Sequence, residues 1–489
     1  MPKKSALQPG ARLLDDPAAP AVPAAISVFT IDRSGKASLS SQLVQQVISL
    51  IAQKVLVQGA KLPSVRECAR QLQISRSTVV DAYDQLVALR HIQARPRSGY
   101  HVVVHDAMPL PGALPSLPAR TYDYIWLLRT QLPDFPGKLN VSTGKLPPLP
   151  AEQQLLAAGM KKVSARLDRE MGWYGSPEGY LPLRQFVQMR LQERGVKAAL
   201  AQVVLTQSAS HAYELVTQLL LSPGDCVLVD DPGYYHLMGH LRFHDIQLIG
   251  VPRTPEGPDI VELDRLAQVH RPKLFFTQSL VHNPTGGSLS PHVAYALLQA
   301  ASRHDLRLVE SDCEADYVSA SKPRLASLDN LSRVIYVSTF SKTVSPSVRV
   351  GYIACNAPLA QDFNDVKLLT SIANAQLNER LAYAVATEPG YRRRVEQQRA
   401  QLEQNGAQTA VALREGGLEI FTPPNGGRFV WARHPRFDDS TAISGLAQAE
   451  DIILAPGKVF RPGLQNTPWF RVNVMLGTDA RFLKFLGSL

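Results

Sequence analysis

Residues 334–352, VIYVSTFSKTVSPSVRVGY, carry the pattern that organises the larger part of this chain. The first four residues, VIYV, have the composition of a buried strand. This strand enters a hydroxyl-rich turn with a single amine, Lys342, and Arg349 follows seven residues later. A lysine among serines and threonines is usually a solvated surface residue. Whether Lys342 is one depends on what other strands place near it.

Short apolar segments of the same kind alternate with helical ones: QVVLTQ (202–207), CVLVDD (226–231), KLFFTQ (273–278) and LRLVES (306–311). This alternation predicts a mostly parallel α/β sheet. Such a sheet binds ligands beyond the carboxyl ends of its strands. Polar residues stand at those ends: Tyr234 in DPGY, Asn283 in NPTG, and the acids Glu310 and Asp312, which alternation places on one face.

Together these groups fit one chemical task, which is to hold pyridoxal 5′-phosphate. A lysine amine forms a Schiff base with the aldehyde, and a carboxylate facing the pyridine nitrogen makes the ring an electron sink. An asparagine can bond the ring hydroxyl, while hydroxyls, helix N-terminal amides and an arginine hold the phosphate. We therefore predict Lys342 as the Schiff-base lysine, with Thr339 and Arg349 as phosphate partners.

This part of the chain resembles the class I aminotransferases, which have the pyridoxal-phosphate transferase fold type I. The shared motifs are Y-x-x-P-x-G-Y-x-x-L-R (174–184), DPGY, NPTG, SK and the late FRVNV. The resemblance implies roles for the following residues: Tyr234 over the cofactor ring, Asn283 at the ring hydroxyl, Ala209 and Ser210 at the phosphate, Arg471 at the substrate α-carboxylate, and Tyr174 at the phosphate of the partner subunit in a homodimer.

The chain also departs from this family. Ser311 stands where the family has the ring-nitrogen aspartate, and Cys313 or Glu314 replaces a tyrosine near the ring hydroxyl. Asp312 remains a candidate for the ring nitrogen if the register shifts. Ser208 replaces the phosphate-loop glycine. These changes put catalysis in question more than cofactor binding.

The positive charge is concentrated in the first fifth of the chain. The 489 residues have a net charge of +10, and residues 1–105 hold 13 Lys+Arg against 6 Asp+Glu, whereas the rest is nearly balanced. A basic segment on a near-neutral body indicates a nucleic-acid module joined to another domain. A solvated basic face is the plain alternative, and charge alone does not decide between them.

The pattern within this basic segment predicts a winged helix-turn-helix. Apolar spacing predicts a helix over 39–57, and Ser64 with Glu67 forms a capping box before a helix at 65–72. Ser75 caps a third helix at about 76–89, whose inward side chains we expect to be Val79, Val80, Tyr83 and Leu86. A basic hairpin, HIQARPRSGYHVVV (91–104), with its turn at Ser98-Gly99, makes the wing.

LPSVRECARQLQISRSTVVDAYDQL (62–86) resembles the GntR-type winged helix. The resemblance implies that the DNA contacts are Arg66, Arg76, Ser77, Thr78 and Gly99. Two such modules in a dimer imply a double-stranded operator with paired half-sites.

We expect four segments: a disordered Ala/Pro-rich arm at 1–38 without the apolar core of a signal peptide, the winged helix at 39–105, a Pro-rich linker at 106–120, and the aminotransferase-like domain at 121–489. Four scattered cysteines without CxxC spacing indicate a reducing compartment and no zinc site. No apolar run is long enough to span a membrane. We expect a bacterial cytoplasmic, nucleoid-associated protein without a metal site.

The whole chain is thus multidomain, an α+β winged helix followed by an α/β domain, and resembles the MocR/GabR transcriptional regulators. This implies that the large domain binds pyridoxal phosphate and senses a small amine or amino acid. Two alternatives stay open. One is a working aminotransferase, and the other is a regulator whose large domain is a cofactor-free dimerisation scaffold.

Overall fold

The computed structural model describes residues 29–33, 37–103, 123–131, 137–146, 150–166 and 169–489. The chain divides into two compact units, Met1–Ala119 and Arg120–Leu489. The expected linker (106–120) and most of the expected arm (1–38) lie outside the described residues. Within the described ranges, no helix combines the length and the apolar character needed to cross a membrane.

The first unit is a three-helix bundle with a β-hairpin. Its elements are α1 (Leu39–Ala52), α2 (Val65–Leu72), α3 (Arg76–Ala88), β1 (Ile92–Arg95) and β2 (Gly99–Val102). The backbone N–H of Glu67 donates to Ser64 Oγ at 3.2 Å, and the N–H of Thr78 donates to Ser75 Oγ at 3.0 Å. These two caps set where α2 and α3 begin.

The inward face of α3 differs from the sequence prediction at one residue. Val79, Tyr83 and Leu86 are fully buried as expected, but Val80 is 38% exposed and Ala82 is buried instead. Successive helical residues are about 100° apart, so Val80 lies at the edge of the face that Val79 centres.

Two local boundaries also differ from the predictions. Helix α1 ends at Ala52 rather than near residue 57, because Lys54 has a left-handed φ of 61° and the chain turns so that Leu56 enters the core. In the wing, the N–H of Ser98 donates to the Arg95 carbonyl at 3.1 Å, with Arg97 at φ 62°. The turn therefore spans residues 95–98 and precedes Gly99.

Residues 29–33, which we assigned to the disordered arm, pack on the bundle. Phe29 is only 5% exposed and belongs to the core of this unit. The backbone N–H of Thr30 donates to Gln46 Oε1 at 2.9 Å. The buried Phe29 ring and the hydrogen bond from Thr30 to Gln46 hold this short segment on the bundle. Composition alone could not predict these contacts.

The second unit is built on an eight-stranded sheet in the order β4-β11-β10-β9-β8-β5-β6-β7. Strands β10, β9, β8, β5 and β6 are parallel, while β11 and β7 run antiparallel to their neighbours. The bounds are β4 (Val203–Thr206), β5 (Cys226–Asp231), β6 (Gln247–Thr254), β7 (Gly257–Pro258), β8 (Leu274–Thr277), β9 (Arg307–Ser311), β10 (Val334–Thr339) and β11 (Gly351–Ala354). All five strands expected from the sequence are present.

Helices flank this sheet, as expected for parallel strands with both faces buried. They are α6 (Leu181–Glu193), α7 (Ala209–Leu220), α8 (Tyr235–Phe243), α9 (Ile260–His270), α10 (Pro291–Arg303), α11 (Leu325–Asp329), α12 (Ala357–Ser371) and α13 (Gln376–Ala386). Two further helices, α4 (Tyr124–Gln131) and α5 (Pro150–Ser164), precede them in the chain.

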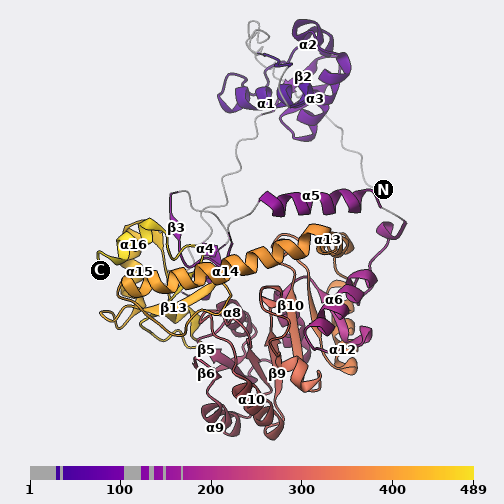
Figure 1. The fold of residues 1–489 in the computed structure, drawn as a ribbon. Helices are drawn as coiled ribbons and strands as arrows, with labels where there is room; N and C mark the ends of the chain where they lie inside the picture. The colour runs from indigo at the N-terminus through magenta and orange to yellow at the C-terminus, as the bar shows by residue number, and fades with distance from the viewer. Residues whose placement is uncertain (1–28, 34–36, 104–122, 132–136, 147–149, 167–168) are drawn as a thin grey trace, which may run out of the picture. The chain divides into compact units, whose positions relative to one another are not determined.

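A smaller C-terminal layer completes the second unit. The long helix α14 (Pro389–Glu415) follows α13, as Figure 1 shows. It leads to a four-stranded sheet in the order β12-β13-β16-β15. Its strands are β12 (Glu419–Ile420), β13 (Phe429–Arg433), β15 (Ala455–Pro456) and β16 (Trp469–Asn473). Helix α15 (Ser440–Ala449) lies between β13 and β15 in the chain, and α16 (Ala480–Leu486) follows β16. Strand β14 (Ile452–Ile453) pairs with β3 (Leu139–Asn140).

Candidate functional site

A cavity of about 130 Å³ lies beyond the carboxyl ends of the large sheet. It collects residues from the ends of β4, β5, β8, β9 and β10, together with Phe429 and Arg471 of the small sheet. The predicted site residues that line it are Ala209, Ser210, Tyr234, Asn283, Thr339, Lys342, Arg349 and Arg471. The structure thus brings together groups that are more than 260 residues apart.

Lys342 has an amine suited to nucleophilic chemistry. Burial, and after it the positive charge of Arg428, lower the pKa of Lys342 to about 8, while Glu314 acts in the opposite direction. Arg428 and Glu314 form a buried ion pair at 2.9 Å. The hydroxyl of Tyr317 donates to the Lys342 carbonyl at 2.6 Å and fixes the backbone of the turn. A substantial neutral fraction of this amine is therefore present near neutral pH.

The N-terminus of α7 faces the cavity without a side-chain cap. Ser208, the residue before the helix, has a φ of 125° and caps no amide of α7. Its hydroxyl accepts a bond of 2.6 Å from Arg349 Nη2. Gly351 allows this close packing, since a Cβ there would lie 2.6 Å from the Ser208 carbonyl carbon. Uncapped helix amides beside an arginine form an anion site.

Arg471 is a buried cation that lacks an acidic partner. Arg471 is 1% exposed, and among the described residues no carboxylate lies within ion-pair distance of its guanidinium. Its Nη1 donates to Asn283 Oδ1 at 2.9 Å and its Nη2 to the Ser142 carbonyl at 2.5 Å, while Nε has no partner. Burial lowers the pKa of Arg471 to about 10. A buried guanidinium in this state is suited to a ligand carboxylate.

Tyr234 and Asn283 follow two adjacent strands of the large sheet, β5 and β8. Tyr234 follows β5, and its ring stacks on His236 with centroids 5.7 Å apart. The backbone N–H of Asn283 donates to Gln278 Oε1 at 3.1 Å. Because Asn283 Oδ1 accepts from Arg471, its amide nitrogen is the group that remains to donate.

The acid strand presents Ser311, and not Asp312, to the cavity. Ser311 lines the cavity, and its hydroxyl accepts a bond of 2.8 Å from Tyr213. Asp312 is 1% exposed on the opposite face. There it receives bonds from Arg324 Nε at 3.0 Å and from the Tyr336 hydroxyl at 2.7 Å. The expectation that Asp312 could meet the cofactor ring is therefore not supported by its position.

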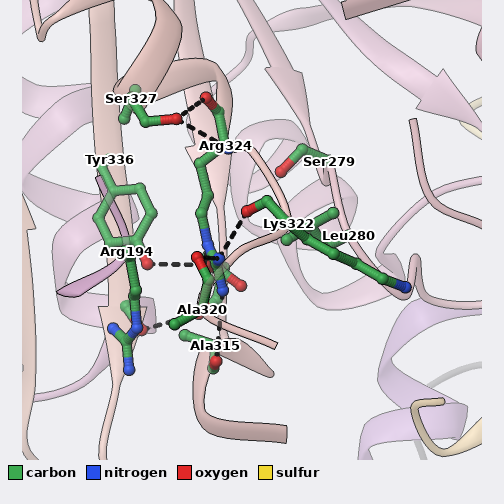
Figure 2. Close-up of polar contacts among 12 residues, drawn as sticks. Arg194, Ser279, Leu280, Ala315, Ala320, Lys322, Arg324, Ser327 and Tyr336 are labelled. Atoms are coloured by element: carbon green, nitrogen blue, oxygen red, sulfur yellow. Dashed lines mark hydrogen bonds and ion pairs between the residues drawn. The ribbon is translucent and has the colours of Figure 1, made fainter. Parts of the chain in front are cut away.

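Figure 2 shows the surroundings of Arg324 and Tyr336, the two residues whose side chains bond Asp312. The guanidinium of Arg324 is fully buried and also donates to the carbonyls of Ala315, Ala320 and Lys322, at 3.4, 3.2 and 2.7 Å. Asp312 is thus the counter-charge of an arginine that closes the loop after β9. Glu310 lies on the same face, where it accepts from the backbone of α11.

Tyr174 does not line the cavity of its own chain. It is 82% exposed, and its neighbour Trp173 is 80% exposed. The structure therefore leaves the predicted role of Tyr174 at a partner's phosphate untested, while its exposure leaves the side chain available for such a contact.

The sequence reasoning missed several residues that line the cavity. These are Gly144, Tyr235, Gln278, Ser341 and Phe429. Gln278 and Ser341 stood directly beside recognised strand ends, so their position was a usable signal. Gly144 and Phe429 come from segments outside the large sheet, and no motif marked them.

The predicted DNA contacts come from three elements of the first unit: Arg66 from α2, Arg76, Ser77 and Thr78 from the start of α3, and Gly99 from the start of β2. Arg66, Arg76 and Ser77 are exposed, and Thr78 is half-buried. The hydroxyls of Ser77 and Thr78 both lie against Ser75 Oγ, at 2.7 and 2.8 Å. Gly99, at the start of β2, has a φ of 97°, and this backbone conformation is sufficient to explain the glycine.

Comparison with known proteins agrees with both units. The model of the family "Aminotransferase class I and II" matches residues 136–489, and that of "Bacterial regulatory proteins, gntR family" matches residues 39–102. The regulator TauR of Rhodobacter capsulatus is 28% identical over 91% of this chain and 95% of its own length. The 2-aminoadipate transaminase of Thermus thermophilus is 30% identical over 68% of this chain and 84% of its own.

Among solved structures, the α-aminoadipate aminotransferase LysN from Thermus thermophilus is similar. It is 26% identical with a TM-score of 0.66 and covers 74% of this chain and 93% of its own. The large domain therefore has the type I fold of the pyridoxal-phosphate-dependent transferases. With its GntR winged helix joined to this domain, the chain belongs to the class I and II aminotransferase family as a regulator of the MocR/GabR type.

Proposed function

We propose that this regulator binds pyridoxal 5′-phosphate through Lys342 and senses a small amine or amino acid. The observation that carries the proposal is the combination, in one cavity, of a low-pKa amine, an uncapped helix N-terminus with Arg349, and the unpaired guanidinium of Arg471. Each of these groups is costly to bury without a partner, and together they match the aldehyde, the phosphate and a ligand carboxylate.

The donor set fits this cofactor at every position except the ring nitrogen. When bound, the cofactor supplies an electrophilic aldehyde and an electron-accepting ring. Lys342 would bond the aldehyde carbon, Asn283 would donate to the ring hydroxyl, and α7 with Arg349 would hold the phosphate. At the ring nitrogen the chain offers the hydroxyl of Ser311, which cannot keep a pyridine protonated as a carboxylate does.

An amino-acid effector would place its carboxylate on Arg471 and its amine beside the Lys342 amine. Competition for the aldehyde would then release Lys342. To change transcription, the effector must bind one state of the regulator more tightly than another, and DNA affinity must differ between these states. We propose that the winged helix reads a double-stranded operator with paired half-sites.

The proposed regulator is a homodimer in which Tyr174 completes the partner's phosphate site. Trp173 and Tyr174 form an exposed aromatic pair, although large aromatic side chains are usually buried or engaged. This contact would make cofactor binding depend on assembly.

The test is an absorption spectrum of the full-length protein with pyridoxal phosphate, before and after borohydride. We expect a reducible band in the wild type and none in Lys342→Ala. Lys367→Met is the matched control: burial also lowers the pKa of Lys367 to about 8, but its amine donates to the Leu205 carbonyl at 2.7 Å. The same band in Lys342→Ala, or none in the wild type, would refute the proposal and favour a cofactor-free scaffold.

A working aminotransferase is the second candidate, and the shared cavity residues favour it. Ser311 counts against rapid turnover because it weakens the electron sink. Exchange between an amino acid and a keto acid by the purified protein, abolished in Lys342→Ala, would support this candidate.

A further inference from the structure

Three side chains of the kinds that ligate metals meet between α7 and α8, outside the cavity. Glu214 lies on α7, His240 lies on α8, and His244 is the residue that ends α8. Their ligand atoms all lie within 4.8 Å of one another. No residue of this group has a part in the function proposed above.

The distances suit a small divalent ion. His244 Nε2 lies 3.1 Å from Glu214 Oε2, and His240 Nδ1 lies 3.5 Å from the same oxygen. Ligands bound to zinc at about 2.0–2.1 Å in a tetrahedron are about 3.3–3.4 Å apart. His240 and His244 are four residues apart on one helix, so both rings project toward α7.

Neighbouring side chains hold the ligands in the orientation that a metal needs. Gln218 Nε2 donates to Glu214 Oε1 at 2.6 Å, which leaves Oε2 facing the histidines. Thr217 Oγ1 lies 3.2 Å from His240 Nε2, which leaves Nδ1 facing Glu214. Outer partners of this kind fix the ring and carboxylate orientation at metal sites.

The cluster is also partly shielded and accessible. The side chains of His240, His244 and Glu214 are 13%, 28% and 31% exposed, so an ion could enter from solvent.

We propose that Glu214, His240 and His244 bind one divalent transition-metal ion, with Zn²⁺ the best match to two imidazoles and a carboxylate. Water would fill the fourth position. This departs from our expectation of no metal site, which rested on cysteine spacing alone. Because α7 begins at Ala209 and α8 follows Tyr234, the ion would join two helices that start at the cavity.

The first test measures the number of Zn²⁺ ions bound per chain of the full-length protein. Metal is first removed with a chelator, and the protein is then dialysed against ZnCl₂ without added cofactor. We expect one Zn²⁺ per chain. His244→Ala should lower the affinity at least about tenfold, since removing even an outer partner of a ligand has that effect. Glu214→Gln, which keeps the side-chain shape, should do the same and guards against misfolding of the alanine variant.

His304→Ala is the matched control. His304 Nε2 makes a similar contact of 2.9 Å with Asp264, but none of the described residues adds a third ligand to this pair. This variant should bind Zn²⁺ like the wild type. As a second measurement, Co²⁺ should give the intense visible bands of a tetrahedral site in the wild type and in His304→Ala only.

Unchanged Zn²⁺ binding in both His244→Ala and Glu214→Gln would overturn the proposal, as would less than one ion per chain in the wild type. Zn²⁺ binding should also be measured with Lys342→Ala, which should bind the ion normally. The metal site can therefore be tested independently of the proposed cofactor function.

Discussion

Lys342 is distinguished from other lysines by the charges around its amine. Burial disfavours its ammonium form, and the Arg428–Glu314 ion pair beside it contributes charges of both signs. Arg428 lowers the pKa of Lys342 and Glu314 raises it. The reactivity of this amine is therefore set by residues that sequence motifs did not mark.

We predict that the reaction of Lys342 with pyridoxal phosphate follows a pH profile with a midpoint of about 8. The fraction of Lys342 in the neutral, reactive form increases as the pH rises through this pKa. Glu314→Gln removes the group that raises this pKa, so its midpoint should move to lower pH. Stopped-flow absorbance across pH measures both, and an unchanged or higher midpoint in Glu314→Gln would contradict the assignment.

We also predict that Ser311→Asp increases transamination half-reaction rates. A carboxylate at this cavity position would keep the ring nitrogen protonated, and the Tyr213 hydroxyl could donate to it as it does to Ser311. We expect an increase of at least about tenfold, since one well-placed electrostatic contact is typically worth about 10²–10³-fold. Ser341→Asp, also in the cavity, is the control that should not gain activity.

The limits of sequence reasoning are clear at β9. Alternation correctly placed Glu310 and Asp312 on one face, because strand side chains have a period of two. It could not say which face meets the cavity. That depends on Arg324, which lies 12 residues farther along and forms the buried pair with Asp312.

At the scale of elements, helix α3 combines a structural face with an exposed end. Its core side is formed by Val79, Tyr83 and Leu86, while Arg76 and Ser77 are exposed at its start. The face and the end are separate in space, so substitutions can test stability and DNA binding independently.

We predict that Leu86→Ala lowers the unfolding free energy of the first unit by about 2–5 kcal/mol, the usual cost of a large-to-small core substitution. Leu86 is fully buried, whereas Leu89 is 55% exposed. Leu89→Ala should therefore change stability by less than about 0.5 kcal/mol. Denaturant unfolding monitors both, and equal effects would show that the inward face of α3 is misassigned.

Elements were predictable where the local signal was strong. The five apolar strands and the starts of α2 and α3 were correct, because apolar runs and serine caps are local features. The end of α1 and the wing turn were wrong because they depend on the left-handed residues Lys54 and Arg97. Nothing in the sequence marks a lysine or an arginine for that conformation.

At the scale of the whole molecule, the chain joins a GntR-type winged helix to an aminotransferase-like domain. The charge asymmetry predicted this division, and the matches to residues 39–102 and 136–489 agree with it. The proposed assembly of two chains was inferred from resemblance alone, because the partners of an exposed residue such as Tyr174 would lie on another chain.

We predict that Arg76→Ala weakens binding to a specific operator by about 1–3 kcal/mol, the usual value of one base contact. Arg70→Ala is the control, because Arg70 already pairs with Glu67 at 2.6 Å on α2. Fluorescence anisotropy at several salt concentrations separates the specific contact from the phosphate contacts, which alter the salt slope. Equal losses in the two variants would mean that Arg76 contributes only charge.

The unpaired guanidinium of Arg471 also has a consequence for stability. Burying a charge without a counter-charge lowers the free energy of unfolding by several kcal/mol. Replacing Arg471 would leave its hydrogen-bond acceptors without a donor, which costs less, about 1–3 kcal/mol. Arg471→Met should therefore melt at a higher temperature than the wild type while no longer responding to effector. Carboxylate ligands should raise the melting temperature of the wild type alone. A thermal-shift screen of amino acids would therefore identify the ligands that bind Arg471, because only these should stabilise the wild type more than Arg471→Met.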